Sequence, residues 1–136
     1  MYQNLIGLWF QISRIMKYEF KIIAFTDDPD FSISLATECN KYGFLLSFIE
    51  HLSEIDSELE DDVIAVTLLD LHENNGNPFK LCERIKNKYE IPIFGVLNAF
   101  SKQSQDEARK SGFDLVFTKK MLIKSIREVV IHVSNE

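Results

Sequence analysis

Acidic residues stand directly after two apolar runs of this 136-residue sequence. Asp27 and Asp28 follow the apolar run 21–25, with one threonine between. Asp70 directly follows the most apolar run, 63–69. Clustered carboxylates repel one another unless protons or a cation intervene, and hard oxygen ligands with room for water and phosphate suit Mg²⁺. A carboxylate can also attack a phosphoryl group and form an aspartyl phosphate.

Two further polar residues stand at the ends of later apolar runs. Asn98 follows the run 91–97, and Lys119 follows the run 115–118. A lysine beside a carboxylate nucleophile can stabilise the transferred charge, and an asparagine amide can donate a hydrogen bond. These side chains would join the acidic residues if the runs were neighbouring parallel strands.

The apolar runs have the length and composition of buried strands, and amphipathic segments separate them. The predicted strands are 21–25, 44–49, 63–69, 91–97 and 115–118. Helix starts are predicted at Asp28-Pro29, at the capping-box pair Ser53 and Asp56, and at Asn77-Pro78. Gly43 and Gly112 suit helix ends because glycine accepts the left-handed conformation there.

Strict alternation of strands and helices predicts an α/β fold with a parallel sheet covered on both faces. Right-handed crossovers favour a flavodoxin-like, doubly wound, five-stranded sheet in the order 2-1-3-4-5. Ligands of such sheets bind beyond the carboxyl ends of the strands, which is where the residues named above should meet. The helix predicted over 101–110 is nearly all polar, so we expect it to be short, exposed and only marginally stable.

The composition excludes several classes of protein. Hydrophobic residues make up 46% and charged residues 26%, a globular balance, and no apolar run is long enough to span a bilayer. The net charge of −6 disfavours direct contact with nucleic acid. Cys39 and Cys82 lack metal-ligand spacing and fall on apolar helix faces, so we expect reduced thiols in a cytoplasmic protein.

Residues 1–18 are expected to form an N-terminal amphipathic helical extension, and 19–136 the main domain. Apolar residues recur in this extension at helical spacing, but no basic residue precedes them and no cleavage site follows, which disfavours a secretory signal. An extra helix covering an apolar patch is one interpretation. A partner-binding or dimerising helix is another, and a start of the protein at Met16 is the third.

Four stretches in this order resemble the receiver domains of bacterial two-component response regulators. They are 25–29, 68–71, 91–99 and 112–119, and the resemblance covers about residues 19–134. The resemblance implies that Asp70 is the phosphoacceptor and that Lys119 contacts the phosphoryl group. It places Asn98 at the position that senses the phosphoryl group, followed by the small residue Ala99.

The resemblance also implies a magnesium site. Asp27 matches one member of the family's metal-binding acidic pair. The second member is Asp28 by composition, or Thr26 if Pro29 sets the alignment. Asp70 would share the metal, and His72 would offer its backbone carbonyl.

The sequence departs from the family pattern at three positions. Asn98 replaces a threonine or serine, and Val116 replaces an aromatic residue whose rotation often reports activation. Phe117 is adjacent, but on a strand it points to the opposite face. Lys120 replaces a proline that is usually cis, so a trans peptide is expected there and Lys119 could be aimed differently.

The resulting hypothesis is a stand-alone receiver that is not an enzyme and signals through protein contacts. It would take a phosphoryl group from a histidine kinase or phosphotransfer protein and act on a downstream target protein, and a homodimer is one alternative. The competing hypothesis is a pseudo-receiver, a protein-binding module whose output does not depend on phosphorylation. A phosphatase or flavin carrier is disfavoured, because no glycine-rich loop follows the first strand and no Asp-x-Asp pair is present.

Overall fold

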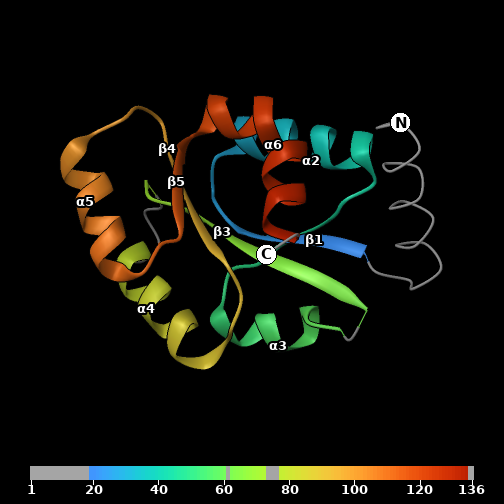
Figure 1. Cartoon of the computed structure of the whole chain (residues 1–136), viewed down its shortest axis with the longest axis horizontal. Coiled ribbons are helices and arrows are strands. Elements are labelled where there is room, and N and C mark those ends of the chain that lie inside the picture. The colour runs from blue at the N-terminus through green and yellow to red at the C-terminus, as the bar shows by residue number, and fades with distance from the viewer. Residues whose placement is uncertain (1–18, 61, 73–76, 135–136) are drawn as a thin grey trace.

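The computed structural model describes residues 19–60, 62–72 and 77–134. Its five parallel strands form one sheet in the order β2-β1-β3-β4-β5 (Figure 1), which confirms the predicted topology. The strands are β1 (Glu19–Phe25), β2 (Leu45–Phe48), β3 (Val63–Asp70), β4 (Ile93–Leu97) and β5 (Leu115–Thr118). The amphipathic helix predicted over 1–18 lies outside the described residues.

Helices cover both faces of the sheet (Figure 1). They are α2 (Pro29–Tyr42), the 3₁₀ turn η1 (Leu52–Glu54), α3 (Ile55–Glu58), α4 (Pro78–Lys88), α5 (Lys102–Ser111) and α6 (Lys119–Ser134). Helices α2 and α6 pack into one apolar cluster, and α3, α4 and α5 into the other. None of the described helices combines the length and apolar character that a membrane crossing requires.

The predicted helix boundaries rest on the expected caps, with one exception. The Asp28 and Asn77 side chains cap α2 and α4, and Gly43 and Gly112 end α2 and α5 with positive φ. The capping box predicted at Ser53 and Asp56 is wrong. Instead, the Glu54 carboxylate accepts the backbone N–H groups of Glu50 and His51, and the cap is His51, so the helical segment starts two residues earlier as a 3₁₀ turn.

Side chains of each strand alternate between the two clusters. Ile22 of β1 packs toward α2 and α6, whereas Ile23 packs toward α3 and α4. On β5, Val116 and Phe117 face opposite sides as predicted, and the Phe117 ring meets Phe94 edge-on at 5.9 Å. A ring at position 117 therefore cannot substitute for one at position 116.

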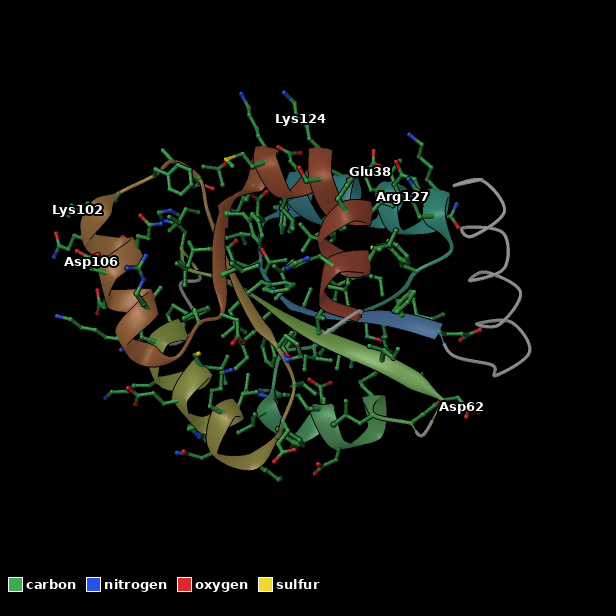
Figure 2. All side chains as sticks on the ribbon, in the orientation of Figure 1. Glu38, Asp62, Lys102, Asp106, Lys124 and Arg127 are labelled. Carbon is green, nitrogen blue, oxygen red and sulfur yellow. The ribbon has the colours of Figure 1, made fainter. Side chains whose placement is uncertain are left out.

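Helices α2 and α4 bury one cysteine each, whereas α5 lies mostly at the surface. Burial raises the pKa of Cys39 to about 12 and that of Cys82 to about 11, so both remain protonated thiols within the core. Helix α5 buries only Ala108, and Figure 2 shows Lys102 and Asp106 pointing outward from it. As predicted, α5 is short and mostly exposed.

A charged pair attaches the short helix α3 to the sheet. The Lys21 ammonium, on β1, pairs with the Glu58 carboxylate, which also accepts the Ser47 hydroxyl at 2.7 Å. The Lys21 side chain is only 11% exposed. Hydrogen bonding from Lys21, followed by that from Ser47, lowers the pKa of Glu58. The carboxylate is therefore ionised when it holds the lysine.

Replacing Glu58 by Gln should lower the free energy of unfolding by about 1–3 kcal/mol, because Lys21 would lose its counter-charge in a mostly buried position. Urea titrations at neutral pH measure this, with the exposed Glu83→Gln as the matched control. Since the pKa of Glu58 is lowered in the folded state, its contribution is complete above the ordinary value and is lost as the pH falls through the folded value. Equal stability of the two variants would contradict this role of the pair.

Candidate functional site

The strand register brings the predicted site residues to one edge of the sheet. Phe25 pairs with Leu69, so Thr26 lies beside Asp70 in the neighbouring strand. Asp70 pairs with Val96, two residues before Asn98. Leu97 pairs with Thr118, the residue before Lys119. Strand pairing alone therefore gathers the ends of β1, β3, β4 and β5.

The Asp70 carboxylate is nearly inaccessible, with its side chain 1% exposed. Its Oδ1 accepts the backbone N–H of His72 at 2.9 Å. Its Oδ2 accepts the Thr26 hydroxyl at 2.7 Å and lies 2.9 Å from the Lys119 ammonium. A buried carboxylate that lacked such partners would be strongly destabilising, so these contacts account for its burial.

Lys119 links two carboxylates at the first residue of α6. Its Nζ lies 2.9 Å from Asp70 Oδ2 and 2.9 Å from Asp28 Oδ2, and 5.5 Å from the centre of the Phe31 ring. Burial opposes the charge on this ammonium, but the hydrogen bonds to Asp70 and Asp28 outweigh it and raise the pKa of Lys119. Lys119 is therefore a permanent cation at physiological pH.

Asp28 has two structural tasks. Its Oδ1 accepts a hydrogen bond from the Phe31 N–H as the cap of α2, while its Oδ2 accepts one from the Lys119 ammonium. The hydrogen bond from Lys119, followed by that from Phe31, lowers the pKa of Asp28. Thr26 also reaches this site directly, since its hydroxyl donates to Asp70 and accepts the Asp28 N–H. Both residues proposed for the second acidic position thus contact the site, Thr26 through its hydroxyl and Asp28 through Lys119.

Asp27 and Asn98 lie at the same edge but stay exposed. Within 19–60, 62–72 and 77–134, neither side chain makes a hydrogen bond or ion pair. Among these residues no group of three or more acidic, histidine or cysteine side chains is arranged to hold a metal ion. The predicted three-carboxylate cluster is therefore not assembled. The carboxylates of Asp27 and Asp70 and the His72 carbonyl are nonetheless hard oxygen donors, and one or two carboxylates with waters suffice for Mg²⁺.

The replacement of proline by Lys120 does not displace Lys119. The described residues contain no cis peptide bond, as expected at this position, and Lys119 still reaches Asp70. Phe31 was not identified as part of the site from the sequence. Its ring packs beneath the ammonium and helps to confine it. The signal was present, because Phe31 follows three residues after the predicted cap Asp28.

No protein-family model and no curated protein matches this sequence. Solved structures do match. A two-component response regulator from Clostridium difficile has a TM-score of 0.70 at 20% identity, covering 87% of this chain and 100% of that one. The receiver domain of the TMAO respiratory system response regulator TorR has a TM-score of 0.69 at 18% identity, covering 84% and 98%.

A response regulator from Burkholderia pseudomallei, described with a phosphorylated aspartic acid, a calcium ion and citrate, has a TM-score of 0.65 at 18% identity. The match covers 82% of this chain and 66% of that one. At these identities the likeness establishes a shared fold. This chain has the fold of response regulator receiver domains, as its motifs predicted.

Replacing Lys119 by Met should lower the free energy of unfolding by about 3–5 kcal/mol at neutral pH, because Asp70 would remain buried without a counter-charge. The neighbouring, exposed Lys120→Met is the matched control and should change stability little. The double variant Asp70→Asn/Lys119→Met should recover part of the loss, since the buried negative charge is then absent. Urea titrations of the four proteins test this, and equal effects of the two lysine variants would refute the bridging role.

Proposed function

We propose that this chain is a receiver module of two-component signalling that accepts a phosphoryl group on Asp70. The observation that carries the proposal is the Asp70–Lys119 pair: a buried carboxylate at the carboxyl end of the central strand, with a cation 2.9 Å from one of its oxygens. The phosphorylated aspartic acid of the Burkholderia pseudomallei protein, which shares the fold, supports the assignment.

In the proposed reaction one Asp70 oxygen forms a bond to phosphorus while the bond from phosphorus to the donor's leaving group breaks. Thr26 and Lys119 hold Oδ2, whereas Oδ1 accepts a single N–H group from His72, so Oδ1 keeps the more available lone pairs. Lys119 then stabilises the charge on the phosphoryl oxygens. The 1% exposure of the Asp70 side chain requires local opening before a donor can enter.

We assign the Mg²⁺ site to the carboxylates of Asp27 and Asp70 and the backbone carbonyl of His72. Asp28 is the less suitable ligand of the two adjacent acids, because its oxygens already serve the α2 cap and Lys119. Asp27 is exposed and has no competing partner in the described part of the chain. When bound, the metal would neutralise charge on the phosphoryl oxygens.

The proposed partners are a histidine kinase or phosphotransfer protein as donor and a downstream target protein. The surface proposed for the target is formed by α5, β5 and the outer side of α6, where Phe100, Leu115 and Met121 are exposed apolar residues. A homodimer through this surface is the alternative occupant. In this scheme the module is a cytoplasmic signalling protein rather than an enzyme.

A second candidate function, a pseudo-receiver, is favoured by specific observations. Asn98 is exposed and its side chain makes no hydrogen bond among the described residues, and Val116 has no ring to rotate. In this alternative the bridge of Asp28, Lys119 and Asp70 is a structural element, and binding of a partner does not depend on phosphorylation.

Incubation with Mg²⁺ and a small acyl-phosphate or phosphoramidate donor should add one phosphoryl mass to the protein, measured as intact mass. Asp70→Asn should abolish the adduct because it removes the nucleophile. Asp27→Asn should weaken the dependence on Mg²⁺ while leaving the acceptor in place, and Asp106→Asn, on the exposed face of α5, is the matched control.

An Asp70→Asn protein that still gains the phosphoryl mass would place the acceptor elsewhere. If the folded wild-type protein gains no phosphoryl mass, the acceptor proposal is refuted and the pseudo-receiver function remains. The Asp27→Asn variant separates the metal assignment from the acceptor assignment, since only the former predicts a change in the Mg²⁺ concentration that gives half-maximal labelling.

Addition of fluoroberyllate, a mimic of the phosphoryl group, should change amide hydrogen exchange mainly in residues 98–112. The reason is that Asn98 can move toward the mimic, while α5 buries only Ala108 and is held weakly. The Asp70→Asn variant is the control. Changes limited to the loops of Asp27 and Asp70 would mean that the site binds the mimic without switching.

A further inference from the structure

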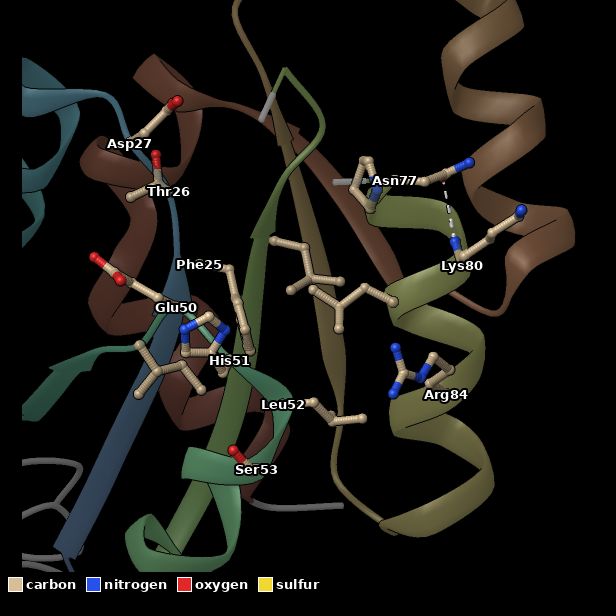
Figure 3. A pocket seen from close by; sticks show the side chains of 14 residues that line it. Phe25, Thr26, Asp27, Glu50, His51, Leu52, Ser53, Asn77, Lys80 and Arg84 are labelled. Atoms are coloured by element: carbon tan, nitrogen blue, oxygen red, sulfur yellow. Dashed lines mark hydrogen bonds between the residues drawn. The ribbon is translucent and has the colours of Figure 1, made fainter. Parts of the chain in front are cut away.

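A cavity of about 850 Å³ lies beside the site, over the carboxyl ends of β1 and β3 (Figure 3). It opens on the face covered by α3 and α4, whereas Lys119 approaches Asp70 from α6, which covers the opposite face. Its size is in the range of pockets that hold small organic molecules. Apart from Thr26 and Asp27, the residues that line this cavity have no part in the receiver chemistry proposed above.

The cavity exists because α3 is too short to cover the sheet. This helix has four residues and follows the 3₁₀ turn η1, and a cavity remains between residues 49–53 and α4, over the ends of β1 and β3. Apolar residues form the floor, chiefly Phe25, Ile49 and Leu69, with Leu52 and Leu81 at the sides.

The α4 wall of the cavity is cationic. Lys80 and Arg84 lie one helical turn apart, and Figure 3 shows the Arg84 guanidinium pointing into the cavity, across from Leu52. In the part of the chain that the structure describes, the Arg84 side chain makes no ion pair and no hydrogen bond. Its five donors are therefore available to a ligand.

Acidic residues line the opposite wall but do not neutralise Arg84. In Figure 3 the Glu50 carboxylate points away from the cavity, and Asp27 lies at its upper end. His51 and Ser53 also line the cavity and can add hydrogen bonds. The cavity thus combines an apolar floor with one inward-pointing, unpaired guanidinium.

We propose that this cavity binds a small amphipathic anion, with an apolar body on the floor and a carboxylate or phosphate group on Arg84. The guanidinium fork matches either anionic group in a two-pronged geometry, which a point charge does not. The apolar floor supplies the remaining affinity through burial. Thr26 lines the cavity and donates its hydroxyl to Asp70, so the cavity borders the proposed acceptor site.

The test uses the fluorescent probe 1-anilinonaphthalene-8-sulfonate, which has an apolar body and one anionic group, and its neutral analogue N-phenyl-1-naphthylamine. Wild-type protein should bind the sulfonate, and Arg84→Met should weaken binding on the order of tenfold while affecting the neutral analogue little. Arg84→Lys should fall between the two proteins. Arg109→Met, an exposed arginine on α5 outside the cavity, is the matched control.

Amide chemical shifts locate the bound probe. Perturbations should concentrate in residues 25–27, 49–53 and 77–84. Equal affinities of Arg84→Met and Arg109→Met, or perturbations concentrated on α5 and β5 instead, would overturn the proposal. Binding is measured without Mg²⁺ or a phosphoryl donor, so its result is independent of whether Asp70 is phosphorylated.

Discussion

The Lys119 ammonium lies 2.9 Å from one carboxylate oxygen of Asp28 and from one of Asp70. These three residues come from the start of α2, the end of β3 and the start of α6, which are distant in sequence. Two negative charges this close would repel each other in a low dielectric. A single buried cation offsets this repulsion, and it makes the acceptor edge of the sheet dependent on the docking of the last helix.

The bridge also shapes the chemistry that the site can perform. Lys119 is held charged by its two partners, and Asp70 is held by Thr26 and His72 in addition. In the proposed reaction, the groups that would stabilise a transferred phosphoryl charge are thus in place before a donor arrives, which is the advantage of a preorganised site. The contacts that hold the Asp70 carboxylate also leave its side chain 1% exposed. The interactions that stabilise this buried carboxylate therefore also restrict the access of other molecules to it.

The two faces of the sheet are unequally covered, and this asymmetry separates two sites. Helices α2 and α6 cover one face and carry the charged bridge. On the other face the short α3 leaves a cavity between the η1 turn and α4. Thr26 belongs to both, through its hydroxyl bond to Asp70 and its position in the cavity lining. Asp27, the proposed metal ligand, also lines the cavity, so the two sites adjoin at the end of β1.

Much of the fold could be predicted from the sequence because its signals are local. Strand-helix alternation, the caps Asp28 and Asn77 and the terminating Gly43 depend on residues close in the chain, and all were borne out. The parallel pairing of the strands then places Asp70 and Lys119 at the same edge of the sheet, independently of how the side chains pack. The start of the helical segment after β2 was predicted wrongly because two acids could close a capping box there. The Glu54 carboxylate, rather than that of Asp56, accepts the backbone N–H of the capping residue.

Tertiary structure alone decided which of two adjacent acids meets Lys119. The sequence predicts Asp28 as the cap of α2, but only the fold brings Lys119 to its second carboxylate oxygen and leaves Asp27 exposed. The cavity likewise depends on how far α3 extends and where α4 lies, which no local pattern encodes. Residue types determine what chemistry is available at the end of each strand. The direction of each side chain, and the space left between helices, follow from packing between segments that are far apart in the chain.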